Sequence, residues 1–178
     1  MLRNTRATYG SVAKVFHWVI FILVVCMLIF GYWMDGITDK TLRASLMNIH
    51  KLIGLTILLI MMLRLIWALL NPKPDLPNAK PWEHRLERIG HFLLYFVLLA
   101  MPIAGWVMAV TAGFAPHIFN FRFQLPLSKN ENVMNIAMGT HNTLAIVIIV
   151  LVSLHILAAL YHYFFKKDNV LQRMMPGN

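Results

Sequence analysis

The stretch HNTLAIVIIVLVSLH, which runs from His141 to His155, decides the fold. It contains no charged residue and lies within an apolar segment, residues 136–165, that exceeds the about 20 residues an α-helix needs to cross a bilayer. Only helices and closed barrels satisfy their backbone hydrogen bonds in lipid. Three more segments of this kind precede it, at residues 15–34, 46–70 and 90–112. We therefore expect an all-α integral membrane four-helix bundle, with residues 1–178 forming a single domain.

The composition is typical of a membrane protein and not of a soluble domain. Of the 178 residues, 59% are hydrophobic and only 13% are charged. The single cysteine, Cys26, excludes a disulfide framework and cannot hold an iron–sulfur cluster alone, so a metal must be carried by histidine or by a prosthetic group. The net charge of +9 comes from basic residues at the ends of the apolar segments. Since they form no stripe with interleaved aromatics, we expect lipid contact and no nucleic-acid partner.

The basic residues also predict the orientation of the chain. Lys and Arg are retained on the cytoplasmic side of multi-pass proteins. In a four-span chain, the amino-terminal arm, the second connector and the tail share one side, which holds Arg3, Arg6, Lys14, Arg64, Lys73, Lys80, Arg85, Arg88, Lys166, Lys167 and Arg173. The opposite side holds the smaller set of Lys40, Arg43, Lys51, Arg122 and Lys129. We therefore expect both termini to be cytoplasmic.

The two longer connectors differ in character. Residues 71–81 contain four prolines and are expected to form a loop, followed by an interfacial turn or helix at 82–88. Residues 113–135 contain aromatic residues between two prolines, which favours a folded cap on the membrane surface. His84 and His117 are assigned to loops and expected to be solvated.

The remaining six of the eight histidines lie in or at the ends of spans: His17, His50, His91, His141, His155 and His162. Polar side chains in hydrocarbon are costly, so such a cluster indicates function. His141 and His155 are fourteen residues apart, which is close to four helical turns. Both imidazoles then face the same way about 21 Å apart along the axis. One helix can thus offer an axial ligand to each of two b haems stacked across the membrane.

Each haem needs a second imidazole from a facing helix at the same depth. His50 lies a few residues into the second span from the outer side, as His141 does in the fourth, so these two are expected to share the outer haem. For the inner haem, His17 must pair with a histidine of the fourth span. Depth counting favours His162, whereas the fourteen-residue spacing favours His155.

Further residues fit the environment of a haem. Arg64 follows His50 by fourteen residues and could pair with propionates of the inner haem, although a snorkelling role at a helix end fits equally well. Gly54 and Gly139 could let a macrocycle approach the backbone or could serve close helix packing. His91 and His162 are candidates for a supporting or quinone-binding role.

The ordered set of motifs resembles the prokaryotic cytochrome b561 family over nearly the whole chain. The matching residues are His17-Trp18, Ile49-His50-Lys51 with Gly54 and Arg64, Gly90-His91, His141, His155, His162, Lys167-Asp168-Asn169 and Arg173-Met174-Met175-Pro176. The resemblance implies a four-helix cytochrome of the bacterial inner membrane that binds two haems b. It also implies that the ligand pairs are His17 with His155 and His50 with His141.

The resemblance further implies an activity, because the family includes a superoxide oxidase that takes electrons from periplasmic superoxide and reduces ubiquinone. On this reading the outer cations, Lys51 and Arg43 foremost, attract the superoxide anion. His162, Tyr163, His91 and Lys14 offer hydrogen bonds or protons to the quinone on the inner side. The alternative is a haem-carrying anchor that relays electrons for a hydrogenase or formate dehydrogenase. The compact chain favours a stand-alone protein, and the loops after the first and third spans match the superoxide oxidase poorly.

Overall fold

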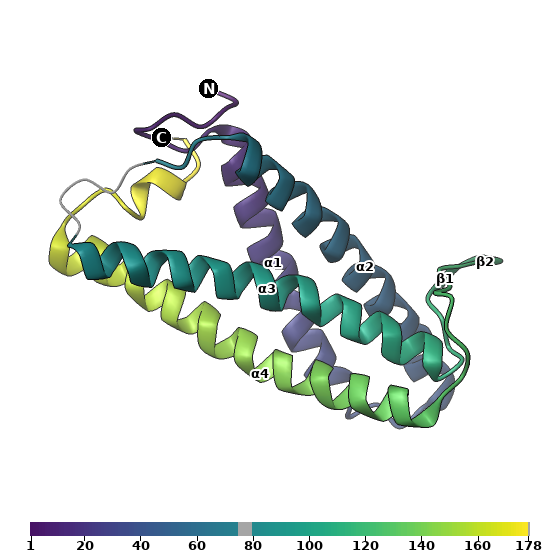
Figure 1. The fold of residues 1–178 in the computed structure, drawn as a ribbon. Helices are drawn as coiled ribbons and strands as arrows, with labels where there is room; N and C mark the ends of the chain where they lie inside the picture. Colours follow the sequence, from purple (N-terminus) through teal and green to yellow (C-terminus); the bar gives the residue numbers. More distant parts are fainter. Residues whose placement is uncertain (75–79, 178) are drawn as a thin grey trace.

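Four long helices make up most of the chain in the computed structural model, which describes residues 1–74 and 80–177 (Figure 1). The helices are α1 (Ser11–Met34), α2 (Lys40–Leu70), α3 (Pro81–Thr111) and α4 (Glu131–Tyr161). Two short strands, β1 (His117–Ile118) and β2 (Phe121–Arg122), lie between α3 and α4. A π-helix, η1 (His162–Lys166), continues α4, and a 3₁₀ turn, η2 (Gln172–Met174), lies near the carboxyl terminus.

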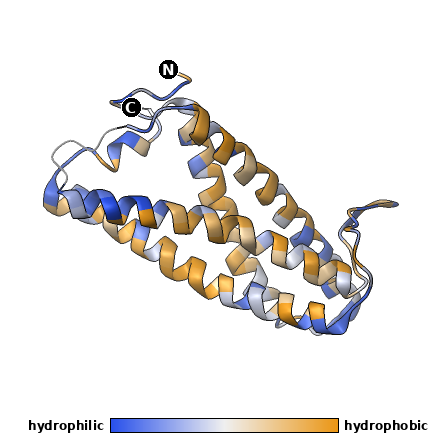
Figure 2. Cartoon of the chain, viewed as in Figure 1, coloured by the Kyte–Doolittle hydropathy of each residue, from blue (hydrophilic) through white to orange (hydrophobic). Residues whose placement is uncertain are grey.

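All four helices are long and apolar enough to cross a membrane, which confirms the predicted all-α membrane bundle. Successive helices run in opposite directions, so both termini lie at the same end of the bundle (Figure 1). The middle of each helix is hydrophobic, and hydrophilic residues gather toward the two ends of the bundle (Figure 2). The end of the bundle that carries both termini is called the terminal end below. The opposite end, which carries β1 and β2, is called the hairpin end.

The helices extend beyond the predicted spans because local signals mark their ends. Asp39 accepts hydrogen bonds from the backbone N–H groups of Thr41 and Leu42, which begins α2 six residues before the predicted span. Asn130 caps α4 in the same way through the N–H of Val133.

The start of α3 corrects one expectation. Pro81 occupies the first helical position, and the Glu83 carboxylate accepts the N–H of Lys80. Residues 82–88 are therefore part of one helix that continues into the third span. The assignment of His84 to a loop was wrong, because His84 lies in the first turn of α3 and is half-buried. His117 lies in β1 and is exposed. Part of the predicted proline-rich loop, residues 75–79, lies outside the described residues.

The predicted cap at 113–135 contains a two-stranded antiparallel hairpin in which His117 pairs with Arg122. The hairpin is held to the bundle on two sides. The Asn48 side chain of α2 donates to the carbonyl of His117 and accepts its N–H, and Trp106 of α3 donates its indole N–H to the carbonyl of Phe123. These bonds fix the start and the return of the hairpin against α2 and α3.

The core is small and lies in the middle of the bundle. Ile20 of α1, Met61 of α2 and Ile148 of α4 are almost fully buried there, with Val97 of α3 beside them. Large apolar side chains such as Leu59 and Ile146 point outward. This pattern is expected where lipid covers the outer face, because lipid tails are as apolar as the side chains they contact.

The core predicts a contrast between two neighbouring methionines of α2. Met61 is 1% exposed and Met62 is 43% exposed. Met61→Ala should lower the free energy of unfolding by about 2 kcal/mol. This is the low end for a buried methionine, because lipid is as apolar as the core and mainly packing contacts are lost. Met62→Ala should lower stability by less than about 0.5 kcal/mol. Denaturation of the two variants in detergent compares them directly, and equal midpoints would contradict this core.

Candidate haem sites

Two pairs of imidazoles face each other at different levels of the bundle, and α4 contributes one histidine to each pair. At the hairpin end, His50 of α2 and His141 of α4 have ring centroids 6.3 Å apart. Toward the terminal end, His17 of α1 and His155 of α4 have ring centroids 6.0 Å apart. The structure therefore brings together the same two pairs that the family resemblance implies.

The orientation of His141 is set by its neighbours. Its Nδ1 lies 3.1 Å from the carbonyl oxygen of Met101 in α3, which can only accept a hydrogen bond. Nδ1 must therefore carry the proton, and Nε2 is left as the ring nitrogen able to bind a metal. A Cβ on Gly105 would lie 3.0 Å from the His141 ring, so glycine is the residue that lets the imidazole approach α3.

His50 lies in a buried site that leaves one of its atoms unsatisfied. The ring packs 5.9 Å from Phe30, between centroids, and 3.5 Å from where a Cβ of Gly31 would lie. Its Nδ1 is buried and has no hydrogen-bond partner among the described residues. Leaving a buried polar atom unpaired is costly, so such an atom is expected where a bound group completes the environment.

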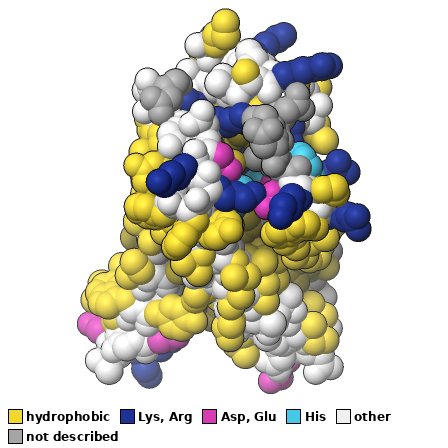
Figure 3. Space-filling model, turned by 90° about the vertical axis from the view of Figure 1, so that its left-hand side faces the viewer, with side chains coloured by type: hydrophobic (Ala, Val, Ile, Leu, Met, Phe, Trp, Pro, Cys, Tyr) yellow, Lys and Arg dark blue, Asp and Glu magenta, His cyan; other side chains and the backbone are white. Residues whose placement is uncertain are grey.

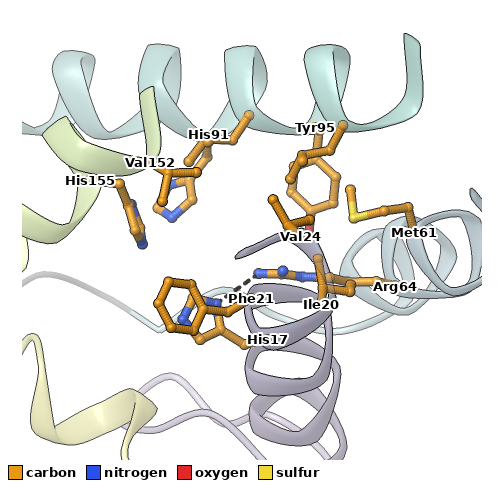
Figure 4. Close-up of a pocket in the computed structure, with 12 residues that line it drawn as sticks. His17, Ile20, Phe21, Val24, Met61, Arg64, His91, Tyr95, Val152 and His155 are labelled. Carbon is orange, nitrogen blue, oxygen red and sulfur yellow. Dashed lines mark hydrogen bonds between the residues drawn. The ribbon is translucent and has the colours of Figure 1, made fainter. Parts of the chain in front are cut away.

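The pair at the terminal end lines a pocket with a strongly apolar wall and about 560 Å³ of empty space, its open side included (Figure 4). All four helices contribute to it. Its lining includes His17, Phe21, Met61, Arg64, His91, Tyr95, Val152 and His155. A concave, mostly apolar site with a few converging polar groups is the usual form of a cofactor site.

Arg64 reaches into this pocket from α2. Its Nη2 lies 3.3 Å from Nδ1 of His17, and its guanidinium lies 5.5 Å from the centre of the Tyr95 ring (Figure 4). Arginine only donates hydrogen bonds, so Nδ1 of His17 acts as the acceptor in this arrangement. A histidine that binds iron through Nε2 needs its proton on Nδ1, and the contact with Arg64 would then have to open.

His91 is a third imidazole at the same level. Its ring centroid lies 5.8 Å from that of His155, and its Nδ1 is 2.9 Å from the carbonyl of Glu87. His155 thus has an imidazole from α1 and one from α3 within similar reach (Figure 4). The sequence placed His91 on the quinone side and did not predict this direct approach to His155.

The separations within the pairs fit a metal held between two rings. A histidine nitrogen binds a metal at about 2 Å and the ring centre lies about 1 Å behind it, so two axial imidazoles have centres about 6 Å apart. The two observed separations agree with this value. No group of three or more His, Cys, Asp or Glu side chains that could hold a bare metal ion occurs in residues 1–74 and 80–177. Paired imidazoles, with a pocket beside the pair at the terminal end, therefore fit haem.

The other predicted inner residues lie outside the pocket lining. His162, in η1, forms a hydrogen bond with Asp168, with 2.6 Å between Nδ1 and Oδ2. Lys14 is buried in α1, one turn before His17. Tyr163 follows His162 and is 43% exposed.

Three of the five predicted outer cations contact other groups of the protein. Arg43 pairs with Asp35 at 3.2 Å, and Lys51 donates from Nζ to the carbonyl of Phe114 at 2.7 Å. The Lys129 side chain passes close beside Gly113, where a Cβ would collide with it. Lys51 and Lys129 therefore meet at the carboxyl end of α3, where cations are favoured by the helix dipole.

Residues near the terminal end contribute features that spacing arguments missed. Tyr9, in the amino-terminal arm, is half-buried within electrostatic range of Glu87, Tyr95 and Arg64, and its burial raises the pKa of the Tyr9 phenol to about 12. Lys73 pairs with Glu87 at 2.6 Å. No periodic pattern marks an arm that folds back, so only the basic residues nearby signalled this end of the molecule.

The fold and the paired histidines define a membrane protein of the haem-binding helical-bundle class. Residues 8–177 match the model of the prokaryotic cytochrome b561 family, and the chain belongs to that family. Membership implies binding of b-type haem and electron transfer within the membrane. The chain is therefore a multi-pass membrane cytochrome.

Three relatives show the range of similarity. The chain is 32% identical to cytochrome b561 homolog 2 of Escherichia coli strain K12, over 97% of this chain and 93% of the relative. It is 29% identical to a probable superoxide oxidase, CybB, of Yersinia pestis, over 90% and 91%. It is 26% identical to cytochrome b561 homolog 1 of Escherichia coli strain K12, over 90% and 92%.

The close approach of Gly105 and His141 predicts the effect of one methyl group. Gly105→Ala should displace the His141 ring and lower the haem content of the purified protein, because a Cβ would lie 3.0 Å from two ring atoms. Gly36→Ala serves as the control, since its Cβ would meet only an ordinary contact of 3.6 Å. Absorbance spectra with haem quantification compare the variants, and wild-type haem content in Gly105→Ala would argue against His141 as a ligand.

Proposed function

We propose that this chain binds two haems b and transfers electrons across the bacterial inner membrane, oxidising superoxide on the outer side and reducing ubiquinone on the cytoplasmic side. In total, two superoxide anions become two O₂, and their two electrons with two protons convert one ubiquinone to ubiquinol. The observation that carries the proposal is the presence of two facing imidazole pairs, at separations of 6.0 Å and 6.3 Å, that share one helix.

The proposed ligands are His50 with His141 at the hairpin end and His17 with His155 at the terminal end. A b haem bound there supplies an iron that accepts and gives one electron at a time. The protein residues hold the rings and set their proton positions. Met101 fixes the tautomer of His141 through its carbonyl.

Arg64 is proposed to bind haem propionates at the terminal end. Its present partner, His17 Nδ1, must carry a proton when His17 binds iron through Nε2, so Arg64 is released in that state. A nearby carboxylate is then the favoured partner for a cation in a largely apolar pocket.

The orientation is proposed from charge. The terminal end carries many Lys and Arg side chains, which gather on the face shown in Figure 3. Because Lys and Arg are retained in the cytoplasm, this end is assigned to the cytoplasmic side and the hairpin end to the periplasm. Ubiquinone then binds at the terminal end, and His91, His162, Tyr163 and Lys14 are the candidates to contact it.

The contacts of the outer cations favour a second candidate function, an electron-relay subunit. Arg43 is paired with Asp35, and Lys51 is bound to the end of α3, so both contribute less to an attractive field than free cations would. An electron-relay subunit for a hydrogenase or formate dehydrogenase needs no such field. Copurification of a large soluble subunit with the chain would favour this second function.

The haem ligands predict which substitutions remove pigment. Replacing His50 or His141 with alanine should reduce the haem content from two per chain to about one, because each iron loses an axial imidazole. His17→Ala should do the same at the terminal end, whereas His91→Ala should retain both haems. Exposed His117→Ala is the matched control. Pyridine haemochrome quantification measures the content, and normal pigment in His50→Ala and His141→Ala would defeat the proposal.

The proposed reaction predicts a salt-dependent rate. Addition of superoxide to the oxidised protein with a ubiquinone analogue should reduce the quinone. Replacing Lys51 and Arg43 together with Gln should slow this reaction several-fold at low ionic strength and much less at high salt, because screening removes steering. Lys73→Gln, at the opposite end, is the control. An unchanged rate at low ionic strength would exclude steering, and no reduction at all would leave the relay function.

A further inference from the structure

The hairpin formed by β1 and β2 carries apolar side chains that the protein leaves exposed. Its strands pair Ile118 with Phe121 and His117 with Arg122, so residues 119 and 120 form the turn. Phe119 is 93% exposed, Phe121 66% and Ile118 47%. Exposed apolar groups that adjoin one another mark a surface that another apolar phase or molecule covers.

The two faces of the hairpin differ in polarity. Residues directly opposite each other in an antiparallel pair point to the same face, and successive residues alternate between faces. Ile118 and Phe121 therefore share one face. Phe123 extends this face, since the ring centroids of Phe121 and Phe123 are 5.0 Å apart. His117 and Arg122 share the other face, so the hairpin is amphipathic.

The turn residue Phe119 adopts a left-handed backbone conformation, with φ of 50°. This conformation is unusual for a bulky residue, and glycine would adopt it with less strain. The phenyl ring therefore stands at the tip of the hairpin at a conformational cost. Because Phe119 is almost fully exposed, contacts within the protein do not offset this cost. A contact outside the protein is needed to account for a phenylalanine here.

The hairpin is attached to the helices inward of their ends. A helix of 31 residues, such as α2 or α3, is about 46 Å long and extends about 8 Å beyond each side of a hydrocarbon core of about 30 Å when centred in it. Asn48 binds the backbone of His117 and lies about 12 Å from the first residue of α2. Trp106 binds the carbonyl of Phe123 and lies about 8 Å from the last residue of α3. Both attachments therefore lie near the boundary between lipid headgroups and acyl chains.

The hairpin points sideways from a fixed base. The N–H of Phe123 donates to the carbonyl of Pro116 at 2.8 Å, and Ala115 and Pro116 are buried. Figure 1 shows β1 and β2 standing away from the four helices at the hairpin end, to the side of α2 and not along the direction of the bundle. Lipid surrounds a membrane bundle on its sides, so a segment at this depth and in this direction meets lipid.

Phospholipid matches both faces of the hairpin. Apolar and aromatic side chains are favoured at the boundary between headgroups and acyl chains, where amphipathic segments insert their apolar face. Arg122, on the opposite face, is then directed to the headgroup level, where lipid phosphates attract cations. Lipid is thus the occupant that the position of the hairpin itself provides.

We propose that the β1–β2 hairpin inserts into the membrane interface. Phe119 and the face of Ile118 and Phe121 enter the leaflet at the hairpin end, and Arg122 lies at the level of the lipid phosphates. Insertion gives the exposed tip the apolar contacts that the chain does not provide. This role does not depend on which electron donor or acceptor the protein uses.

The test places the photoreactive amino acid p-benzoylphenylalanine at position 119 of the full-length holoprotein, in nanodiscs of phosphatidylethanolamine and phosphatidylglycerol. On irradiation its benzophenone group inserts into a neighbouring C–H bond, and mass spectrometry identifies the molecule attached. The same amino acid at position 128 is the matched control, because Ser128 is exposed and polar and belongs to the same connector. The yield of phospholipid adduct should be several-fold higher at position 119 than at position 128.

A second measurement moves the photoreactive amino acid to position 121 and compares two substitutions of the tip. Phe119→Asp should lower the phospholipid adduct at position 121 several-fold, because a carboxylate is costly among acyl chains. Phe119→Leu should keep the adduct, because leucine remains apolar. Haem content equal to that of the wild-type protein shows that each variant is folded.

Equal phospholipid adducts at positions 119 and 128 would overturn the proposal. A covalent dimer at position 119 in place of the lipid adduct would also overturn it, because the exposed face would then belong to contact with a second copy of the chain. An adduct at position 121 that Phe119→Asp leaves unchanged would exclude insertion of the tip.

Discussion

The structure depends on one constraint, which is that imidazoles inside a lipid-covered bundle must have partners. A polar ring in hydrocarbon is costly, yet this chain places five histidines at two levels between its helices. Backbone carbonyls accept hydrogen bonds from two of these rings, Met101 from His141 and Glu87 from His91. Nδ1 of His50 has no hydrogen-bond partner within residues 1–74 and 80–177. The hairpin-end site therefore holds a buried imidazole that the protein satisfies only in part.

The packing of the helices reflects the same requirement. Small residues allow the helices to approach the rings, with Gly105 facing His141 and Gly31 facing His50. At the terminal end the helices leave a pocket that reaches the core, because Met61 and Ile20 line it. The core cluster around Met61 and Ile148 lies between the two histidine levels, and further buried residues such as Val110 lie at the hairpin end. Packing in the middle thus separates the two sites, and the pocket gives the terminal end room for a ligand.

Charges at the two ends have unequal roles. At the hairpin end, Lys51 and Lys129 are directed to the carboxyl end of α3, so part of the positive charge stabilises the fold. At the terminal end, Lys73 pairs with Glu87, whose carboxylate also lies 3.6 Å from Nδ1 of His91. The sequence shows only which side of the membrane these cations share, and their partners decide which of them can act on a substrate.

The sequence by itself determined the four membrane helices and the candidate ligands, because hydrophobic length and the fourteen-residue spacing of His141 and His155 depend only on helical geometry. The assignment of His84 to a loop was wrong, because Pro81 and Glu83 begin a helix that includes it. Spacing along one helix cannot show which ring on another helix faces His155. Only the tertiary structure placed both His17 and His91 there, bound Arg64 to His17 and returned Asp168 to His162. These contacts depend on the relative rotation of helices and on a reversal of the chain, and neither leaves a periodic pattern in the sequence.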